Sequence, residues 1–456
     1  MNQELNLQFL GGAGTVTGSK TLLTLNGKKI LIDCGLFQGL KELRSLNWKK
    51  LPTELADIDA VILTHAHLDH CGYLPVLVKH GFKGPIYCTP STAELTEIIL
   101  LDSAKIQEED ADRANRHNYS SHLHCKPLYT VEDARKTFHL FQTHEYREWV
   151  LIEHNLKFQL LNAGHILGSA MVELKAGTKT FLFSGDIGRK DPMLLYPPQK
   201  VNQADYVILE STYGDRIHKV DDIKERLLEI IDSTINTGGI LMIPSFAVER
   251  TQELIYLIYQ LKEEGRLPQV PVYLDSPMGI KSTLVFEKYP QIQDISKIDT
   301  RRMYDVVKFI SEYEESKAVV ADKKPKIVLA GSGMLEGGRM LHYISNHGEN
   351  PNNTILFVGF QAAGTRGRDL VQGMRKIKFF GEYRDVKCRI ESISGMSAHA
   401  DREEMLNWLK EFKQEPNTVF LNHGEPHQTN ALRTYIESNL GWNVEIPKLN
   451  ELFEIE

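Results

Sequence analysis

Short runs of alternating apolar and polar residues open the chain. Residues 5–9 alternate in the way of a strand with one buried face. Two more strand-like runs, 21–25 and 28–33, are joined by Asn26-Gly27, a dipeptide typical of tight hairpin turns. Residues 60–64, AVILT, form a short apolar run that leads directly into a group of histidines. The first part of the chain is therefore predicted to contain mainly strands and turns.

The spacing of apolar residues changes further along the chain. Residues 92–141 are polar with helical spacing, which predicts a helical arm on the surface. In the middle of the chain, apolar runs at 240–244, 326–330 and 354–358 alternate with helical segments, among them 250–264. Alternation of strand and helix is typical of a parallel sheet covered by helices, so we expect such a sheet here.

The composition is that of an ordinary folded protein, with 42% hydrophobic and 25% charged residues. No apolar run is long enough to cross a bilayer, and the start MNQELNLQF lacks the pattern of a secretory signal. The five cysteines are odd in number and form no CxxC pair, which argues against a disulfide framework and a cysteine-type zinc site. We therefore expect a cytoplasmic protein that binds no membrane.

The formal net charge of −7 argues against broad, nonspecific binding to nucleic acid. A nucleic-acid enzyme with this charge needs a local basic patch. Residues 364–378 offer one, with five basic residues against one acidic residue. Because such a run is more often a solvated face, the charge alone leaves its role open.

The strongest chemical signal is HAHLDH at residues 65–70, directly after the apolar run. His65, His67, Asp69 and His70 offer four metal ligands within six residues. Burying them without a metal would strand polar groups at a cost of about 1–3 kcal/mol each. Imidazole and carboxylate ligands suit zinc, with manganese or iron as alternatives. Four adjacent ligands cannot all surround one tetrahedral ion and leave an open position, so two metals are predicted.

Two ions need further ligands, and three candidates stand at the ends of apolar runs. They are His165 in NAGHILGS, Asp186 in FSGDIG and His423 in LNHGE. Each follows a strand-like stretch and has a glycine beside it. A ligand on a loop above a sheet would have this setting.

These motifs resemble those of the metallo-β-lactamase fold, and the resemblance covers essentially the whole chain. Asp33 in LIDCG matches the first motif, HAHLDH the second, His165 the third and Asp186 the fourth. The resemblance implies that His65, His67 and His165 hold one zinc ion. It implies that Asp69, His70 and His423 hold a second, with Asp186 between the two and Asp33 supporting the ligands from behind.

Three further motifs resemble those of the β-CASP nuclease subgroup, which includes bacterial and archaeal relatives of the cleavage and polyadenylation specificity factor endonuclease. Glu210 in ESTYG matches motif A, His399 in SAHAD matches motif B, and His423 matches motif C. In this subgroup a histidine at motif C is typical of RNA-processing members. The resemblance therefore implies a zinc-dependent ribonuclease that hydrolyses phosphodiester bonds in single-stranded RNA.

The chemistry expected at such a site is attack by a hydroxide held between two divalent ions that lie about 3.5–4 Å apart. His399 is the candidate general acid for the leaving 3′-oxygen. Glu210 would orient His399 and raise its pKa. Together with the ligand Asp69, these residues form the predicted catalytic set.

RNA-binding residues are expected at glycine- and serine-bearing strand ends of the insert, where backbone amides can hold phosphate oxygens. The candidates are Ser245, Arg250, Ser332, Gly333 and Gln361, joined by Arg366 of the basic stretch and by Ser397 and Ala398 of SAHAD. Together they predict an RNA groove between the domains.

The predicted fold class is α/β: an αββα metallo-β-lactamase sandwich with an inserted parallel-sheet domain. The sandwich domain is expected from two segments, 1–212 and 379–456, around a β-CASP insert at 213–378. His423 lies after the insert but belongs with His65, so the outer segments must fold together.

Other functions stay open at this point. The same zinc site could serve a DNA nuclease, or a hydrolase of small phosphodiesters or thioesters. A third alternative is a noncatalytic scaffold protein. No long domain follows His423, which favours endonucleolytic cleavage, with exonuclease action left open. A homodimer is also left open.

Overall fold

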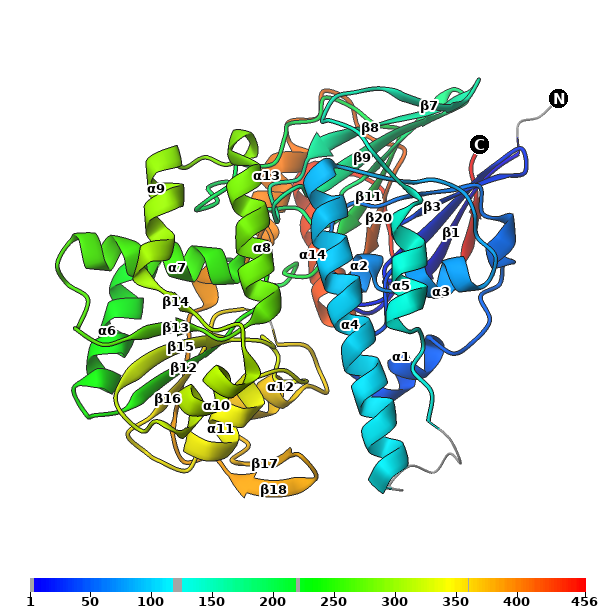
Figure 1. Cartoon of the computed structure of the whole chain (residues 1–456). Coiled ribbons are helices and arrows are strands. Elements are labelled where there is room, and N and C mark those ends of the chain that lie inside the picture. Colours follow the sequence, from blue (N-terminus) through cyan, green and yellow to red (C-terminus); the bar gives the residue numbers. More distant parts are fainter. Residues whose placement is uncertain (1–3, 118–124, 219–221, 360) are drawn as a thin grey trace. The chain divides into compact units, whose positions relative to one another are not determined.

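The computed structural model describes residues 4–117, 125–218, 222–359 and 361–456 (Figure 1). The chain forms two compact units, each described by itself below. Unit 1 consists of Met1–Pro192, Tyr196–Ile217 and His399–Glu456. Unit 2 consists of Met193–Leu195 and His218–Ala398.

The first sheet of unit 1 has the strand order β22-β1-β2-β3-β4-β5-β6. Its strands are β1 (Leu5–Gly11), β2 (Lys20–Leu25), β3 (Lys28–Ile32), β4 (Ala60–Ile62), β5 (Ile86–Cys88), β6 (Phe141–Thr143) and β22 (Leu452–Glu454). The pairs β1–β2 and β2–β3 are antiparallel, whereas β3 to β6 run parallel.

The second sheet of unit 1 has the order β21-β20-β11-β10-β9-β8-β7. Its strands are β7 (Val150–Glu153), β8 (Leu156–Asn162), β9 (Ala170–Ala176), β10 (Lys179–Phe183), β11 (Tyr206–Glu210), β20 (Thr418–Asn422) and β21 (Val444–Glu445). Strand β20 pairs in parallel with β11, and Asn422 lies opposite Glu210. The segment after residue 398 therefore returns to the sheet that residues 150–210 began.

Apolar side chains from the two sheets of unit 1 pack against each other in one core. Phe9 and Leu23 of the first sheet and Phe158, Val172 and Phe181 of the second belong to it. Full burial of each such side chain contributes about 1.5–3 kcal/mol. The alternation of apolar residues that predicted β1 follows from this arrangement, because every second side chain of the strand faces the core.

Helices cover the outer faces of both sheets of unit 1. Because β4, β5 and β6 are parallel, the chain between them must cross one face of the first sheet, and the inner face is occupied by the second. The helices of this unit are α1 (Lys41–Leu46), α2 (Leu68–Cys71), α3 (Leu74–Lys79), α4 (Pro90–His117), α5 (Val131–Phe138), α13 (Arg402–Leu409) and α14 (Pro426–Leu440). Leu406 of α13 and Leu432 of α14 pack with the outer face of the second sheet. These layers confirm the predicted αββα sandwich.

Unit 2 is built on a sheet in which all paired strands are parallel, with the order β14-β13-β15-β12-β16-β19. The strands are β12 (Ile240–Pro244), β13 (Val272–Leu274), β14 (Lys308–Phe309), β15 (Lys326–Ala330), β16 (Thr354–Phe357) and β19 (Arg389–Ser392). Separate apolar clusters lie on the two faces of this sheet, one containing Leu241 and the other Met242. The predicted parallel sheet is therefore confirmed.

The sheet of unit 2 is accompanied by helices and by one hairpin. The helices are α6 (Ile223–Ile235), α7 (Arg250–Glu263), α8 (Pro277–Lys288), α9 (Lys297–Arg302), α10 (Tyr313–Ala321), α11 (Met340–His347) and α12 (Arg366–Val371). The hairpin pairs β17 (Lys376–Phe379) with β18 (Glu382–Asp385) in a sheet of its own. No helix of the described residues is long and apolar enough to span a bilayer.

The compact units divide the chain at places that differ from the boundaries expected from the sequence. Residues 379–398 pack with unit 2, because β19 pairs with β16 in the parallel sheet. Residues 193–195 also belong to unit 2, and Leu195 forms an isolated bridge with Gln293. The chain thus leaves unit 1 briefly between Pro192 and Tyr196, and leaves it again after Ile217 to re-enter it at His399.

Candidate metal centre

A short loop after β4 carries the first predicted ligands. His65 and His67 lie in this loop, and Asp69 and His70 lie in the α2 turn that follows. The apolar strand β4 anchors the loop in the core between the sheets. His65 and His70 are only 0% and 1% exposed. Since buried imidazoles need polar partners, this loop requires hydrogen bonds or a metal.

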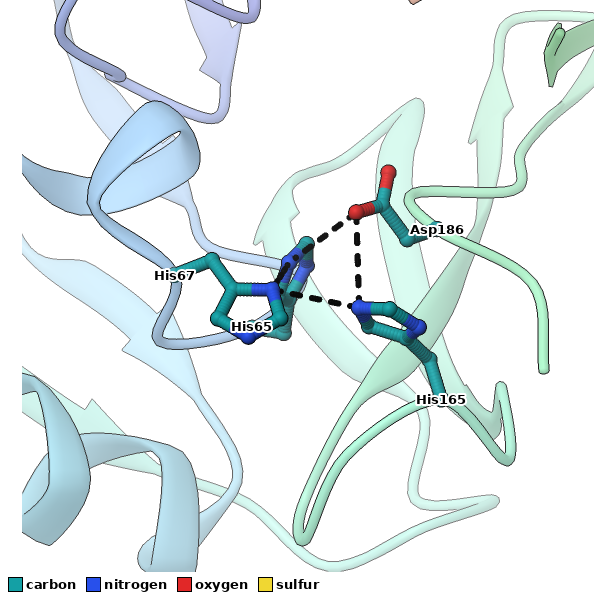
Figure 2. Close-up of side chains that lie close together, drawn as sticks. All are labelled: His65, His67, His165 and Asp186. Atoms are coloured by element: carbon teal, nitrogen blue, oxygen red, sulfur yellow. Dashed lines mark hydrogen bonds and ion pairs between the residues drawn. The ribbon is translucent and has the colours of Figure 1, made fainter. Parts of the chain in front are cut away.

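The side chains of a first ligand group point toward one another, as Figure 2 shows. His67 Nδ1 lies 3.1 Å from both His65 Nε2 and His165 Nε2. Asp186 Oδ2 lies 3.4 Å from His65 Nε2 and 3.5 Å from His165 Nε2. His165 comes from the loop between β8 and β9, and Asp186 follows β10. Loops of both sheets therefore meet at this point.

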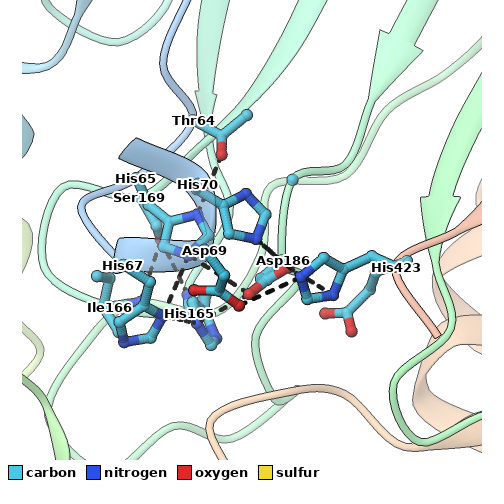
Figure 3. A network of polar contacts seen from close by, with 12 residues as sticks. Thr64, His65, His67, Asp69, His70, His165, Ile166, Ser169, Asp186 and His423 are labelled. Atoms are coloured by element: carbon cyan, nitrogen blue, oxygen red, sulfur yellow. Dashed lines mark hydrogen bonds and ion pairs between the residues drawn. The ribbon is translucent and has the colours of Figure 1, made fainter. Parts of the chain in front are cut away.

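A second group lies beside the first and consists of Asp69, His70 and His423 (Figure 3). His70 Nε2 lies 3.0 Å from His423 Nε2, and His423 Nε2 lies 3.4 Å from Asp69 Oδ2. His423 directly follows β20 and has a left-handed backbone, with φ of 49°. The parallel pairing of β20 with β11 brings it to residues more than 350 positions earlier in the sequence.

Asp186 lies between the two groups. Its Oδ2 faces the first group, whereas its Oδ1 lies 3.3 Å from His70 Nε2 and 3.5 Å from His423 Nδ1. Burial alone raises the pKa of a carboxyl, but the neighbouring His423 and His70 outweigh it and hold the pKa of Asp186 well below its usual range. Asp186 Oδ1 is buried without a hydrogen-bond partner among the described residues. A buried carboxylate with an oxygen of this kind fits a cation.

The donor atoms of the cluster fit divalent metal ions. Burial lowers the pKa of His65 to about 3 and that of His67 to about 4, so both offer a free electron pair at neutral pH. Two nitrogens bound to one tetrahedral zinc lie ~3.3 Å apart. The distances of 3.1 Å from His67 Nδ1 to its two neighbours are close to this value. The geometry and the donor atoms of the cluster therefore fit a metal site.

Asp33 connects the ligands of both groups from behind. Its carboxylate accepts hydrogen bonds from His70 Nδ1 at 2.7 Å and from the Thr64 amide and hydroxyl at 2.8 and 2.9 Å. The Thr64 hydroxyl oxygen lies 3.0 Å from His65 Nδ1, from which it can accept a hydrogen bond. Both histidines are thereby held with Nε2 toward the cluster.

Two threonines around the site escaped the interpretation of the sequence. Thr64 links Asp33 to His65, as described above. Thr212 donates to the backbone oxygen of His423 at 3.2 Å, and its hydroxyl lies 3.3 Å from His423 Nδ1. Thr64 directly precedes HAHLDH and Thr212 follows Glu210 by two positions. The only feature of the sequence that could have pointed to Thr64 or Thr212 is that each lies next to a recognised motif.

Glu210 and His399 form a pair next to the predicted metal ligands. His399 Nδ1 lies 3.0 Å from both carboxylate oxygens of Glu210, which ends β11 and is 2% exposed. The His399 ring lies 4.5 Å from the His165 ring, centre to centre. Burial alone lowers the pKa of His399, but the charges of Glu210 and Asp186 outweigh it and raise this pKa to about 9. The carboxylates beside His399 therefore favour its protonated form.

Comparisons with known proteins agree with this geometry. Residues 14–235 match the model of the metallo-beta-lactamase superfamily, residues 251–370 that of the Beta-Casp domain, and residues 383–447 that of the Zn-dependent metallo-hydrolase RNA specificity domain. A ribonuclease of Thermus thermophilus is 36% identical over 433 residues, which cover 92% of this chain and 94% of that protein. The chain belongs to the β-CASP group of the metallo-β-lactamase superfamily.

Other relatives extend the comparison. The transcription termination factor FttA of Methanosarcina mazei is 32% identical over 444 residues, covering 93% of this chain and 67% of that protein. The crystal structure of a protein of unknown function from Enterococcus faecalis superposes with a TM-score of 0.55 at 13% identity, covering 99% of this chain and 100% of that one. That likeness supports the fold alone. The family resemblance found in the sequence is confirmed, and the β-CASP protein is a metal-dependent hydrolase.

The β-CASP part of the chain places several predicted RNA-binding residues at one edge of the unit 2 sheet. Ser245 follows β12, Ser332 and Gly333 follow β15, and Gln361 comes after β16. Gln361 Nε2 donates to the backbone oxygen of Gly333 at 3.1 Å, so these two loops touch. Parallel strands deliver their carboxyl ends to the same edge, which explains the gathering.

The other predicted RNA-binding residues are at least partly buried or have partners within the protein. Arg250 is 6% exposed and pairs with Glu253. Arg366 Nε donates to the backbone oxygen of Lys378 at 2.9 Å. Ser397 is buried and Ala398 is half-buried, at the end of unit 2. Contact between RNA and any of these residues stays a prediction.

Proposed function

We propose that this β-CASP protein is a zinc-dependent ribonuclease that cuts phosphodiester bonds inside single-stranded RNA. The observation that carries the proposal is a pair of ligand groups that share Asp186, with the Glu210–His399 pair beside them. The RNA specificity domain matched at residues 383–447 and the relative named a ribonuclease support RNA as the substrate.

Two zinc ions are proposed because the ligands fall into two sets. His65, His67 and His165 would hold one ion, and Asp69, His70 and His423 would hold the other, with Asp186 reaching both. When bound, the ions would place positive charge at the phosphate oxygens and lower the pKa of a water for attack on phosphorus. Asp33 would keep His70 and, through Thr64, His65 in the tautomers that bind metal.

His399 is proposed as the general acid. Its raised pKa of about 9 keeps it protonated at neutral pH, so it has a proton to donate to the leaving 3′-oxygen. Glu210 accepts from Nδ1 and fixes the ring, which assigns the transfer to Nε2. Glu210 is thus a positioning residue, and His399 is the group that meets the substrate.

His423 also favours RNA over DNA, because a histidine at this motif is typical of RNA-processing members of the group. A cytoplasmic location is part of the proposal. The cysteines Cys34, Cys71, Cys88, Cys125 and Cys388 are all unpaired, which suits a reducing compartment.

The decisive experiment compares cleavage of single-stranded RNA and DNA of one sequence by the wild type and His399→Ala. The wild type should carry close to two zinc ions per chain and cut RNA, including a circular RNA that only an endonuclease can open. His399→Ala should keep its zinc and lose a factor of about 10²–10⁴ in rate, as expected for loss of a general acid.

A matched control is His427→Ala, since His427 is a histidine of unit 1 whose side chain is 81% exposed. It should cut RNA at the wild-type rate. Cleavage of DNA but not RNA would overturn the substrate, and an unchanged rate in His399→Ala would overturn the role of His399. A protein that binds no metal would overturn the proposal of a zinc-dependent enzyme.

A further inference from the structure

The hairpin β17–β18 of unit 2 turns an unusual set of side chains outward. Its turn residues, Phe380 and Gly381, both have positive φ, 51° and 92°, which matches the twist of a tight hairpin. Ile377 and Phe379 of β17 are 3% and 1% exposed and belong to the apolar core of the unit. The alternate residues of β17, Lys376 and Lys378, are exposed, so the opposite face of the hairpin is open to solvent.

The open face carries an aromatic ring between basic side chains. Lys378 lies opposite Tyr383 in the register, and Lys376 lies opposite Asp385, so these four share one face. Tyr383 is 66% exposed. Lys378 Nζ lies 5.9 Å from the centre of its ring. We call this face, Lys376, Lys378 and Tyr383, the hairpin platform.

The hairpin platform is held rigidly enough to present these groups. Arg384 donates to the backbone oxygen of Ser345 in α11 at 3.2 Å. The Phe380 ring stacks on His342 of the same helix with 4.7 Å between ring centres. Arg366 donates to the backbone oxygen of Lys378 at 2.9 Å. Contacts to two neighbouring helices thus fix the strands behind the exposed ring.

The charge around the hairpin platform is opposite to that of the whole chain. Residues 366–387 contain seven basic and three acidic residues, whereas the chain carries a net charge of −7. Of the acidic residues in the hairpin, Glu382 pairs with Arg384 at 3.1 Å. The platform itself therefore has two lysines against one carboxylate, that of Asp385.

We propose that the hairpin platform is a binding surface for single-stranded RNA, on which a base stacks against Tyr383 while Lys376 and Lys378 neutralise adjacent phosphates. A flat exposed ring next to cations is the combination by which proteins hold single strands without reading their sequence. This inference rests on the proposed function, because it names a second contact for the same substrate.

The test measures binding of a fluorescent phosphorothioate RNA of about twelve nucleotides, a length in the range of single-strand binding sites. Phosphorothioate linkages keep the charge and bases but resist cleavage, so the zinc-loaded full chain can be used. Tyr383→Thr removes the ring but keeps a residue that favours strands, and should weaken binding about tenfold. Tyr383→Phe should bind like the wild type.

The lysines have a readout of their own. Each of Lys376→Ala and Lys378→Ala should lower the slope of log affinity against log salt concentration by about 0.7. Loss of a merely structural contact would change affinity without changing this slope.

A matched control exists in the same unit. Tyr313 on α10 is 59% exposed, and Lys317 Nζ lies 4.3 Å from the centre of its ring, but Glu312, Glu314 and Glu315 surround it in sequence. Tyr313→Ala should leave RNA affinity unchanged. Equal affinity of the wild type and Tyr383→Thr would overturn the proposal. A dimer that Tyr383→Thr converts to a monomer would assign the platform to a second copy of the chain, and would also overturn it.

Cleavage is scored separately from binding. Platform-dependent binding by a protein that cuts no RNA supports this inference and overturns the proposed function. Cleavage of RNA together with unchanged binding by Tyr383→Thr overturns this inference alone.

Discussion

A single carboxylate, that of Asp33, supports proposed metal ligands of both groups. It accepts from His70 directly and from Thr64, whose hydroxyl meets His65. All its close partners are donors, so an amide in its place would turn at least one N–H toward another donor. The orientation of His70 and His65 therefore depends on the negative charge as well as on the shape of the side chain.

We expect Asp33→Asn to lower zinc affinity by about 10–100-fold, the usual loss when the partner of a metal-binding histidine is removed. Competition with a chelating dye measures this directly and does not depend on catalysis. Asp57→Asn is the control, because Asp57 is an aspartate of the same unit whose side chain is 60% exposed. Wild-type zinc affinity in Asp33→Asn would mean that the orientation of His65 and His70 does not depend on the Asp33 carboxylate.

Glu210 governs the pH at which His399 loses its proton. In the wild type the pKa of His399 is raised to about 9 despite burial, with the charge of Glu210 as the largest raising influence. An acid must be protonated, so the rate should fall as the pH rises through that pKa. Glu210→Gln removes the charge but keeps a side chain of similar size. Metal bound to Asp186 would reduce the effect of the Asp186 charge on the pKa of His399.

The alkaline limb of the profile of kcat/KM against pH should therefore move to lower pH in Glu210→Gln, by at least one unit if the charge is worth about 1.4 kcal/mol. Single-turnover rates between pH 6 and pH 10 would measure it. A limb that stays in place would assign that ionisation to a group other than His399.

At the scale of elements, the C-terminal end of α10 in unit 2 is hydrogen-bonded to two buried basic side chains from outside the helix. Lys326 Nζ donates to the backbone oxygens of Val319, at 2.6 Å, and of Asp322. His347 Nε2 lies 2.7 Å from the backbone oxygen of Val320. The last carbonyls of a helix have no partner within it, so these side chains complete the hydrogen bonds of its final turn. Lys326 also begins β15, and thus joins the helix end to the sheet.

Lys326→Met keeps most of the side-chain length but removes all three donors. We expect unit 2 to lose about 1–3 kcal/mol of unfolding free energy, because the carbonyl oxygens stay buried without partners. Urea denaturation followed by circular dichroism would measure it, with the exposed Lys324→Ala as control. Equal stability of Lys326→Met and the wild type would show that relief of the buried charge offsets the lost hydrogen bonds.

The elements that the sequence predicted best are strands buried on both faces. The apolar runs 240–244 and 326–330 coincide with β12 and β15, since a central parallel strand has no solvent face to interrupt the run. The hairpin β17–β18 was missed because the residues of β18 are all exposed and carry no alternation. Long-range pairing was equally invisible: the bond from Thr64 to Asp33 and the pairing of β20 with β11 depend on the fold.

The ligand cluster was accessible from sequence because metal ligands are chemically restricted. Three histidines and an aspartate in six residues have few explanations, and the structure brings them together with His165, Asp186 and His423. RNA-binding residues are harder to predict, since serine, glycine and arginine at strand ends also serve the protein itself. Arg250 is an example, because it is buried against Glu253.

At the scale of the molecule, the chain has two units with separate apolar cores. Phe9 and Phe158 belong to the core of unit 1, whereas Leu241 and Leu274 belong to that of unit 2. All the proposed metal ligands lie in unit 1. Metal that binds only folded protein stabilises it by about 4 kcal/mol at a free concentration a thousand times the dissociation constant. This stabilisation should appear in the unfolding of unit 1.

Scanning calorimetry of the full chain should then resolve two transitions that respond to different changes. Removal of zinc by a chelator should lower one of them by about 10 °C, as expected for that free energy in a unit of this size. Lys326→Met should lower the other, because its effect lies in unit 2. Since the ligands come from β-strand ends on both sides of the insert, the zinc-dependent transition must include residues before 217 and after 399. One transition that moves under both changes would mean that the two units unfold as a single body.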